Sequence, residues 1–196
     1  MARKTFKTVP YRRRREEKTN YKKRISLIKS NQPRLVIRRS LNNLIVQIIE
    51  FDPKGDRILI EAQAKNLAEF GWKSLTGNIP SSYLTGYLAG IKAKKAKLKA
   101  DPIFDLGPQT STKGSRIYAA VKGFIDSGYE LNAKDTIFPD QARIKGTHIE
   151  NYAKHLKETD PSLYEKRFSS YLKNKIDPTS LSKQFETSKQ KIGELK

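Results

Sequence analysis

Apolar residues recur with helical spacing in two long segments of the chain. The clearest period follows Ser115 and predicts one buried helix face: Ile117, Ala120, Val121, Phe124 and Ile125. Gly128 is typical of a helix C-terminus and predicts where this helix ends. A longer helix is expected to begin near residues 78–81, because proline is tolerated in a first turn, and to bury a second stripe: Tyr83, Leu84, Tyr87, Leu88 and Ile91. Gly86 and Gly90, four residues apart, indicate close packing of this helix.

Short alternating or β-branched segments that precede these two helices favour strands. Residues 35–38 alternate between the two faces of a strand, and residues 44–51 are rich in β-branched side chains. A strong turn at residues 52–56 contains Pro and Gly, and residues 58–60 return as a third strand. An antiparallel meander is the simplest arrangement of these three strands. A fourth short, buried strand is expected within residues 101–107.

Helical patterns also occur towards both ends. No Pro or Gly interrupts residues 12–30, so one amphipathic helix is predicted there after an extended arm over residues 1–11. Beyond residue 146 the pattern predicts one helix near residues 149–156 and another after Asp160, with a shorter one after Asp177. The last fifteen residues are polar, and we expect them to become ordered only with a partner.

Together these elements predict an α/β fold. The expected architecture is a mixed sheet with an antiparallel meander and packed helices, a basic N-terminal arm and a helical C-terminal extension. We expect residues 1–30 to form the basic arm and helix, residues 31–146 the α/β core domain, and residues 147–196 the extension with its polar tail. A length of 196 residues fits one domain with such appendages.

The positive charge is concentrated on the first fifth of the chain. The sequence has 40 Lys and Arg against 20 Asp and Glu, a net charge of +20. Residues 1–40 hold fifteen of these cations and only two acidic residues, which accounts for about two thirds of the excess. Self-repulsion on this scale is costly without a counter-charge. We therefore expect a polyanionic partner, nucleic acid before an anionic membrane.

Several classes of protein are excluded by composition. The absence of cysteine excludes disulfides, thiolate metal sites and cysteine nucleophiles. Residues 44–51 are the longest apolar segment, and Gln47 and Glu50 interrupt them, so we expect no membrane span. The first residues lack the apolar stretch of a secretory signal. A soluble intracellular protein without a membrane partner is the expectation.

Aromatic and cationic residues alternate along the N-terminal arm. Four consecutive arginines lie between Tyr11 and Tyr21: Arg12, Arg13, Arg14 and Arg15. Guanidinium groups pair with phosphates, and tyrosine rings stack on unpaired bases. Such a run suits a phosphate backbone that changes direction better than a smooth duplex groove. A nuclear or nucleolar targeting signal is an alternative that is compatible with this interpretation.

Residues 110–116 form a second candidate site, because they precede a predicted helix N-terminus. Hydroxyl groups, two cations and Gly114 make this loop a plausible phosphate cradle. Its glycine spacing is not that of a nucleotide-hydrolysing loop. A helix-capping loop that binds no ligand is the alternative.

No catalytic or metal-binding constellation is evident. Asp52, Asp56 and Glu61 surround a predicted hairpin, and turn or cap roles explain them, as they explain the acidic pair Asp101 and Asp105. The two histidines, His148 and His155, have no third ligand or base nearby in the sequence. We expect no enzymatic activity, no cofactor and no metal ion.

Eight short strings, in order and spacing, resemble the archaeal form of a universal family of large-subunit ribosomal proteins. This is family eighteen of the large subunit, which binds 5S rRNA and includes the eukaryotic ribosomal protein L-five. The strings are YRRRRE at 11–16, PRLVIRRS at 33–40, QIIE at 47–50, FGWK at 70–73, TGNIP at 76–80, YLTG at 83–86, TKGSR at 112–116, and RIKG followed by HI within 143–149. The resemblance covers residues from about 3 to 155.

The resemblance implies which residues contact RNA. On the arm they are Tyr11, Arg12, Arg13, Arg14, Arg15, Asn20, Tyr21 and Arg24. On the core they are Arg38, Ser40, Asn42, Lys73, Thr112, Lys113, Gly114, Ser115 and Arg116. The chemistry of the residues points independently to the arm and to the loop before Arg116, whereas Ser40, Asn42 and Lys73 rest on the resemblance alone.

The resemblance also implies the partners. They are 5S rRNA, 23S rRNA and neighbouring large-subunit proteins, including the other protein that binds 5S rRNA, in the central protuberance of the cytoplasmic ribosome. The implied role is to anchor 5S rRNA to 23S rRNA. Two other classes stay open from the residues alone: a chromatin-type protein that binds nucleic acid without specificity, and a metal-dependent nuclease.

Overall fold

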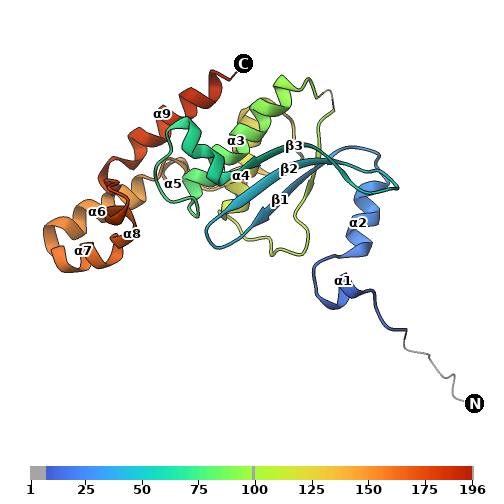
Figure 1. Ribbon diagram of the computed structural model, residues 1–196, viewed down its shortest axis with the longest axis horizontal. Coiled ribbons are helices and arrows are strands. Elements are labelled where there is room, and N and C mark those ends of the chain that lie inside the picture. Colours follow the sequence, from blue (N-terminus) through green and yellow to red (C-terminus); the bar gives the residue numbers. More distant parts are fainter. Residues whose placement is uncertain (1–7, 99, 196) are drawn as a thin grey trace, which may run out of the picture.

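A four-stranded mixed sheet forms the centre of the computed structural model, which describes residues 8–98 and 100–195 (Figure 1). Its strands are β1 (Arg34–Arg39), β2 (Leu44–Glu50), β3 (Arg57–Gln63) and β4 (Ile103–Asp105), in the order β3-β2-β1-β4. The first three are antiparallel neighbours, and β4 pairs parallel to β1. The predicted meander and mixed sheet are confirmed.

Two helices cover one face of this sheet. They are α3 (Ile79–Lys95) and α4 (Arg116–Asp126), and they close a core to which the strands contribute alternate side chains such as Leu35 and Ile37, both fully buried. The side chain of Asn78 accepts a hydrogen bond from the Ser81 N–H at 2.9 Å and caps α3, with Pro80 in the first turn. A 3-10 helix (Ala64–Phe70) connects β3 to this layer.

The two helices cross closely because glycines line their contact. A Cβ atom at Gly86 would lie 1.9 Å from the carbonyl oxygen of Ala120, and one at Gly123 would lie 2.1 Å from that of Tyr83. At Gly90 a Cβ atom would lie 1.8 Å from the hydroxyl of Ser127. Backbone therefore packs directly on backbone, as the spacing of Gly86 and Gly90 predicts.

The prediction of one continuous helix over residues 12–30 is wrong. The structure has two, α1 (Arg12–Arg15) and α2 (Tyr21–Ile28), and neither contains a buried residue. Between them Glu17 adopts a positive φ of 53°, and the side chain of Asn20 accepts a hydrogen bond from the Lys23 N–H at 3.1 Å, which starts α2 afresh. Residues 1–7 of the expected extended arm lie outside the described residues.

The C-terminal part of the chain is helical, and it lies at the opposite end of the sheet from the arm (Figure 1). It comprises α5 (Gln141–Lys145), α6 (Thr147–Thr159), α7 (Pro161–Arg167), α8 (Ser169–Lys173) and α9 (Leu181–Gly193), with short 3-10 helices at Asp135–Ile137 and Pro178–Ser180. Asp160 caps α7 by accepting a hydrogen bond from the Leu163 N–H at 3.0 Å, as predicted.

The expectation that the last fifteen residues are ordered only by a partner is also wrong. They fall largely on α9, which packs on α3 through one apolar stripe that includes Phe185 and Ile192, both buried. The Phe185 ring lies 5.5 Å from the Tyr83 ring, and the Lys189 ammonium donates a hydrogen bond to the Tyr83 hydroxyl at 3.0 Å. That hydroxyl donates in turn to Asp126 at 2.6 Å. No helix among the described residues is long and apolar enough to cross a membrane.

Candidate nucleic-acid interface

Unpaired arginines cover the outer surface of the arm. Arg14 and Arg15 are exposed, and their side chains make no hydrogen bond or ion pair with any described residue. Arg13 donates from Nε to the Thr19 hydroxyl at 2.8 Å, and Arg12 lies 4.0 Å from Glu16. An exposed guanidinium keeps its planar set of donors available for an external phosphate. The arm therefore presents cationic donors that the protein itself does not use.

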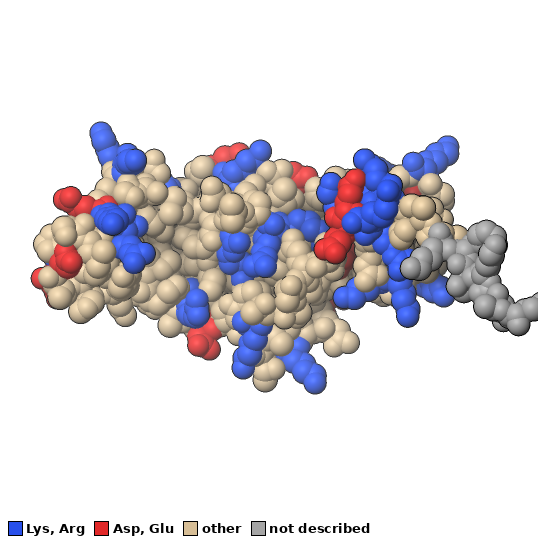
Figure 2. Space-filling model, turned by 90° about the horizontal axis from the view of Figure 1, so that it is seen from below, with Lys and Arg blue, Asp and Glu red and all other residues tan. Residues whose placement is uncertain are grey.

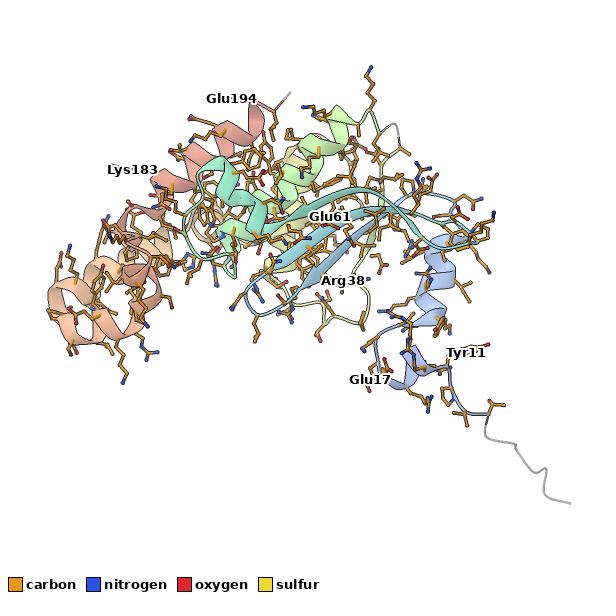
Figure 3. All side chains as sticks on the ribbon, in the orientation of Figure 1. Tyr11, Glu17, Arg38, Glu61, Lys183 and Glu194 are labelled. Atoms are coloured by element: carbon orange, nitrogen blue, oxygen red, sulfur yellow. The ribbon has the colours of Figure 1, made fainter. Side chains whose placement is uncertain are left out.

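Two tyrosine rings accompany these cations. Tyr11 precedes α1 and Tyr21 begins α2, and their ring centroids are 5.5 Å apart at an interplanar angle of 58°. Tyr11 is 75% exposed and lies far from the sheet (Figure 3). An exposed ring beside guanidinium groups can stack on an unpaired base.

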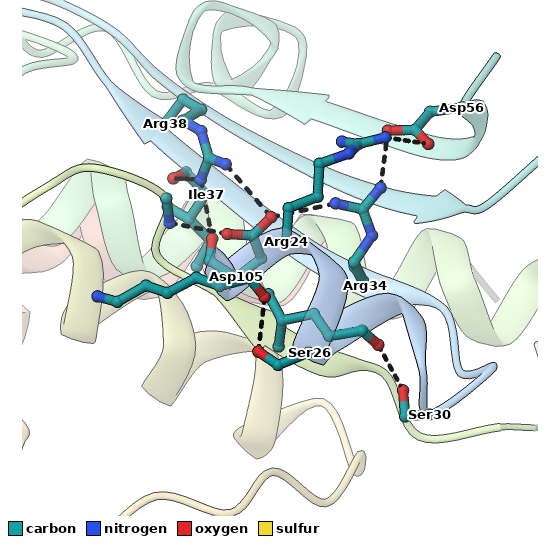
Figure 4. Close-up of polar contacts among 11 residues, drawn as sticks. Arg24, Ser26, Ser30, Arg34, Ile37, Arg38, Asp56 and Asp105 are labelled. Atoms are coloured by element: carbon teal, nitrogen blue, oxygen red, sulfur yellow. Dashed lines mark hydrogen bonds and ion pairs between the residues drawn. The ribbon is translucent and has the colours of Figure 1, made fainter. Parts of the chain in front are cut away.

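An ion pair attaches the arm to the sheet. Arg24 of α2 donates to Oδ1 of Asp56 in the β2–β3 turn at 2.8 Å, and Arg34 of β1 donates to Oδ2 of the same carboxylate at 2.7 Å (Figure 4). Burial acts to raise the pKa of Asp56, but the hydrogen bonds and charges of Arg34 and Arg24 outweigh it, and the pKa is lowered. The carboxylate therefore holds two arginines from two elements.

A second carboxylate continues this network across the sheet. Arg34 is 2% exposed and donates to Asp105 of β4 at 3.2 Å, while Arg38 lies 3.4 Å from the same oxygen (Figure 4). Asp105 also accepts a hydrogen bond from the Gly107 N–H at 2.7 Å. A Cβ atom at Gly107, whose φ is +63°, would lie 2.7 Å from the Arg38 guanidinium carbon, so a larger residue here would strain the turn and displace Arg38.

A hollow of about 150 Å³ lies between the arm and the sheet. Six cationic and two acidic side chains line it: Arg13, Lys18, Lys23, Arg24, Arg34, Arg38, Asp56 and Asp105. Lys and Arg side chains also crowd the end of the molecule that carries the arm (Figure 2). This excess of positive charge makes the end of the molecule attractive to a polyanion.

The part of the sheet formed by β2 and β3 carries polar side chains. There Glu61 of β3, labelled in Figure 3, accepts a hydrogen bond from the Gln47 side chain at 2.6 Å and a second from Gln63. These two bonds lower the pKa of Glu61 and keep it anionic. Glu61 and its two amide partners make this part of the sheet polar, and the charges of Lys65 and Lys92 also act on Glu61.

The remaining predicted site residues lie at the other end of β1. Ser40 and Asn42 form the turn after this strand, where the Ser40 hydroxyl donates to the Asn43 carbonyl at 3.1 Å. The Arg116 guanidinium donates to the carbonyl oxygens of Ser40 at 3.0 Å, Leu41 at 3.1 Å and Gly77 at 2.9 Å. Arg116 thus fixes this turn against the start of α4 and keeps its positive charge without a carboxylate partner.

The loop before α4 is exposed, as a ligand-binding loop requires. Thr112 and Lys113 are exposed, and Gly114 has a φ of +67° and donates its N–H to the Ile137 carbonyl at 2.9 Å. Ser115 occupies the N-cap position, but its side chain makes no capping hydrogen bond. Lys73 is exposed in the connection to α3.

Two groups of predicted residues therefore emerge. Arg13, Asn20, Arg24 and Arg38 line one hollow between the arm and β1, whereas Arg12, Arg14, Arg15 and Tyr21 lie outside it. The turn after β1 and the start of α4 form the second group, which Arg116 joins. Sequence reasoning missed Arg34 and assigned Asp56 and Asp105 only turn and cap roles. No local signal identifies such a network, because Arg34 and Asp105 are 71 residues apart. Among the described residues no group of three or more His, Asp or Glu could hold a metal ion.

A folded α/β core that carries an arginine-rich arm with exposed aromatic rings is typical of nucleic-acid-binding proteins. The sequence model of the family described as "Ribosomal large subunit proteins 60S L5, and 50S L18" matches residues 4–104. The large ribosomal subunit protein uL18 of Methanococcus maripaludis is 45% identical over 184 residues, which is 94% of this chain and 94% of that protein. The chain belongs to this family of large-subunit ribosomal proteins.

Family membership confirms the resemblance to the large-subunit ribosomal proteins and defines the class of activity. The protein is a structural, non-enzymatic component of the large subunit of the cytoplasmic ribosome. It associates there with ribosomal RNA and with other ribosomal proteins. A metal-dependent nuclease is thereby ruled out.

Proposed function

We propose that the protein binds 5S rRNA and anchors it to 23S rRNA in the central protuberance. The observation that carries this proposal is the arm, whose unpaired arginines and exposed Tyr11 are attached to the core by the Arg24–Asp56 ion pair. Phosphate contacts from Arg12, Arg13, Arg14 and Arg15 supply affinity. Stacking and shape on non-duplex RNA supply selectivity.

The three expected regions have separate roles in this proposal. Residues 1–30 are the RNA-binding arm, residues 31–146 form the core domain that rests on 5S rRNA, and residues 147–196 extend the core towards neighbouring proteins. Those neighbours include the other protein that binds 5S rRNA. The turn with Ser40 and Asn42, Lys73, and the loop from Thr112 to Arg116 add further RNA contacts.

A competition titration tests the proposal. Labelled 5S rRNA is bound to the full chain at about 150 mM salt and displaced by unlabelled tRNA or by duplex DNA of matched length. Preference for 5S rRNA by a factor of ~10³ or more is the expected result. Equal competition by all three polyanions contradicts it and favours a non-specific, chromatin-type mode of binding.

The anchoring step has its own assay. 23S rRNA is immobilised, and retention of labelled 5S rRNA is measured with and without the protein. Retention that depends on the protein is expected. A variant with glutamine in place of Arg14 and Arg15 should lose most of it, while one with glutamine in place of Lys95 and Lys166, which are exposed outside the arm, should retain it. Retention equal in both variants contradicts the role of the arm.

A further inference from the structure

A second basic site lies at the end of β1 that is remote from the arm. Arg34 begins this strand beside the arm and Arg39 ends it, so their Cα atoms are about 17 Å apart along the strand. A shallow hollow of about 370 Å³ opens beside Arg39. Its walls come from β1, from the starts of α3 and α4, and from α5 and α6.

Four cationic or titratable side chains converge on this hollow. They are Arg39 of β1, Arg116 of α4, Arg143 of α5 and His148 of α6. All the residues that line the hollow are described in the structure, and none of them is Asp or Glu. Arg39 and Arg143 are exposed, and their side chains make no ion pair with a described residue. The hollow is therefore a concentration of positive charge without a counter-charge.

The positive charges of these side chains make the charged state of their neighbours less favourable. Desolvation and the neighbouring Arg39 lower the pKa of Arg116. Desolvation and Arg143 likewise lower the pKa of His148, against the opposing effect of a hydrogen bond to the backbone of Ala142. A bound anion would relieve this repulsion.

Uncharged donors complete the site. The N-terminus of α4, a helix of 11 residues, opens on the hollow, and the first N–H groups of a helix have no intrahelical acceptor. The hydroxyl oxygen of Ser115, at the N-cap, is buried and has no hydrogen-bond partner among the described residues. A side chain in this position normally caps its own helix. Because Ser115 does not cap α4, the first N–H groups of this helix can donate to an acceptor from outside the protein.

We propose that this hollow binds a phosphate group of the RNA backbone, distinct from the phosphates held by the arm. The proposal rests on the proposed function only for the source of the phosphate. Arg39 and Arg143 supply the exposed charge, Arg116 supplies charge from behind the turn that it fixes, and Ser115 with the start of α4 supplies the neutral donors. The two ends of β1 then hold two separate points of the RNA.

The histidines provide a local test on the wild-type chain. His148 faces the hollow, while His155, the second of the two histidines in the sequence, lies outside it on α6. Both imidazoles are titrated by NMR with inorganic phosphate or with chloride at equal ionic strength. Phosphate should raise the pKa of His148 by roughly half a unit or more and leave His155 unchanged. Equal shifts at both histidines overturn the site.

A paired variant tests whether the phosphate belongs to RNA. Arg39→Gln with Arg143→Gln should abolish the effect of phosphate on His148. It should also reduce the slope of log affinity against log salt by about 0.7 per lost contact for single-stranded RNA, measured with 5S rRNA and with 23S rRNA. The control, Lys95→Gln with Lys166→Gln, should change neither quantity. A phosphate effect without any change of slope for either RNA overturns the assignment to RNA.

The two proposals can fail separately. If wild-type protein binds 5S rRNA no better than tRNA, the proposed function fails, yet the response of His148 to phosphate and the change of slope can still be measured. If 5S rRNA is bound selectively but the Arg39 and Arg143 variant behaves like its control, only the second site fails.

Discussion

Arg24 donates a hydrogen bond of 2.8 Å to Asp56, which lies 32 residues further along the chain. This contact joins the arm to the β2–β3 turn, and the same carboxylate holds the buried Arg34. The ion pair that attaches the arm to the sheet therefore depends on one acidic side chain. An arm without this contact would have to be ordered by any partner that it binds, at an entropic cost.

Replacement of this carboxylate should destabilise the protein. Asp56→Asn removes the charge that pairs with Arg24 and Arg34 and leaves Arg34 with Asp105 alone. We expect the free energy of unfolding in urea to fall by about 1–3 kcal/mol. The control Glu50→Gln changes an exposed carboxylate at the end of β2 and should cost less than about 0.5 kcal/mol. Equal losses in the two variants would contradict the role of Asp56.

The stability of the wild-type protein and that of Asp56→Asn should respond differently to acid. The pKa of Asp56 is lowered in the folded state, so its contribution to stability is fully present above the unfolded value of about 3.9 and is lost as the pH falls through the folded pKa. The difference in unfolding free energy between wild type and Asp56→Asn should therefore shrink below about pH 4. Urea unfolding at a series of pH values measures it. A difference that stays constant into strong acid would show that the charge of Asp56 is not what stabilises the arm contact.

The crossing of α3 and α4 should not tolerate a side chain at Gly86. A Cβ atom there would lie 1.9 Å from a backbone oxygen, so Gly86→Ala forces the helices apart. We expect thermal unfolding to reveal a loss of about 1–3 kcal/mol or more. Gly193→Ala is the control, since its Cβ would lie 3.6 Å from the Tyr87 hydroxyl, at ordinary contact distance. Unchanged stability of Gly86→Ala would mean that the helices are not packed this closely.

The docking of α9 can be tested at its largest buried residue. Phe185→Ala should lower the free energy of unfolding by about 3–5 kcal/mol and accelerate amide hydrogen exchange along α9. Thr187→Ala, on the exposed side of the same helix, should do neither. Rapid exchange along α9 in the wild-type protein would contradict stable docking of this helix on α3.

Removal of two arm arginines should change the electrostatic part of RNA binding. For Arg14→Gln with Arg15→Gln, the slope of log affinity against log salt for 5S rRNA should decrease by about 1.4–1.8, which corresponds to two phosphate contacts. The fold should be unaffected because both side chains are exposed and unpaired within the described chain. An unchanged slope would exclude these two residues as phosphate contacts.

The elements that sequence reasoning identified correctly are those with strong local signals. The apolar period of α4, the capped start of α3 at Asn78 and the Pro-Gly turn between β2 and β3 each reside within a few residues. The sequence predicts a helix after Asp177, but a shorter one than α9. The break in the arm and the length of α9 were missed for different reasons. Asn20 is a helix cap within a run that otherwise favours a helix, and the stripe Leu181, Phe185, Ser188 and Ile192 contains only three apolar residues among many polar ones.

The candidate site likewise contains parts that the sequence predicts and parts that it does not. The arginine run and the loop before α4 were found because their chemistry is contiguous in the sequence. The attachment of the arm was not, because it joins Arg24, Arg34, Asp56 and Asp105 from four separate segments. For the same reason the loop before α4 was predicted without the rest of its hollow, since Arg143 and His148 reach it only through the packing of α5 and α6. Long-range charge pairs follow from the fold and leave no trace in local periodicity.

The packing of α9 on α3 also constrains when the protein can finish folding. Translation proceeds from the N-terminus, so the sheet, α3 and α4 are complete before residues 181–193 have been synthesised. Until those residues leave the ribosome that makes them, the rings of Tyr83 and Tyr87 on α3 have no cover from Phe185 and Lys189. The nascent chain therefore exposes an aromatic surface on α3, and the core is complete only when α9 has packed on it.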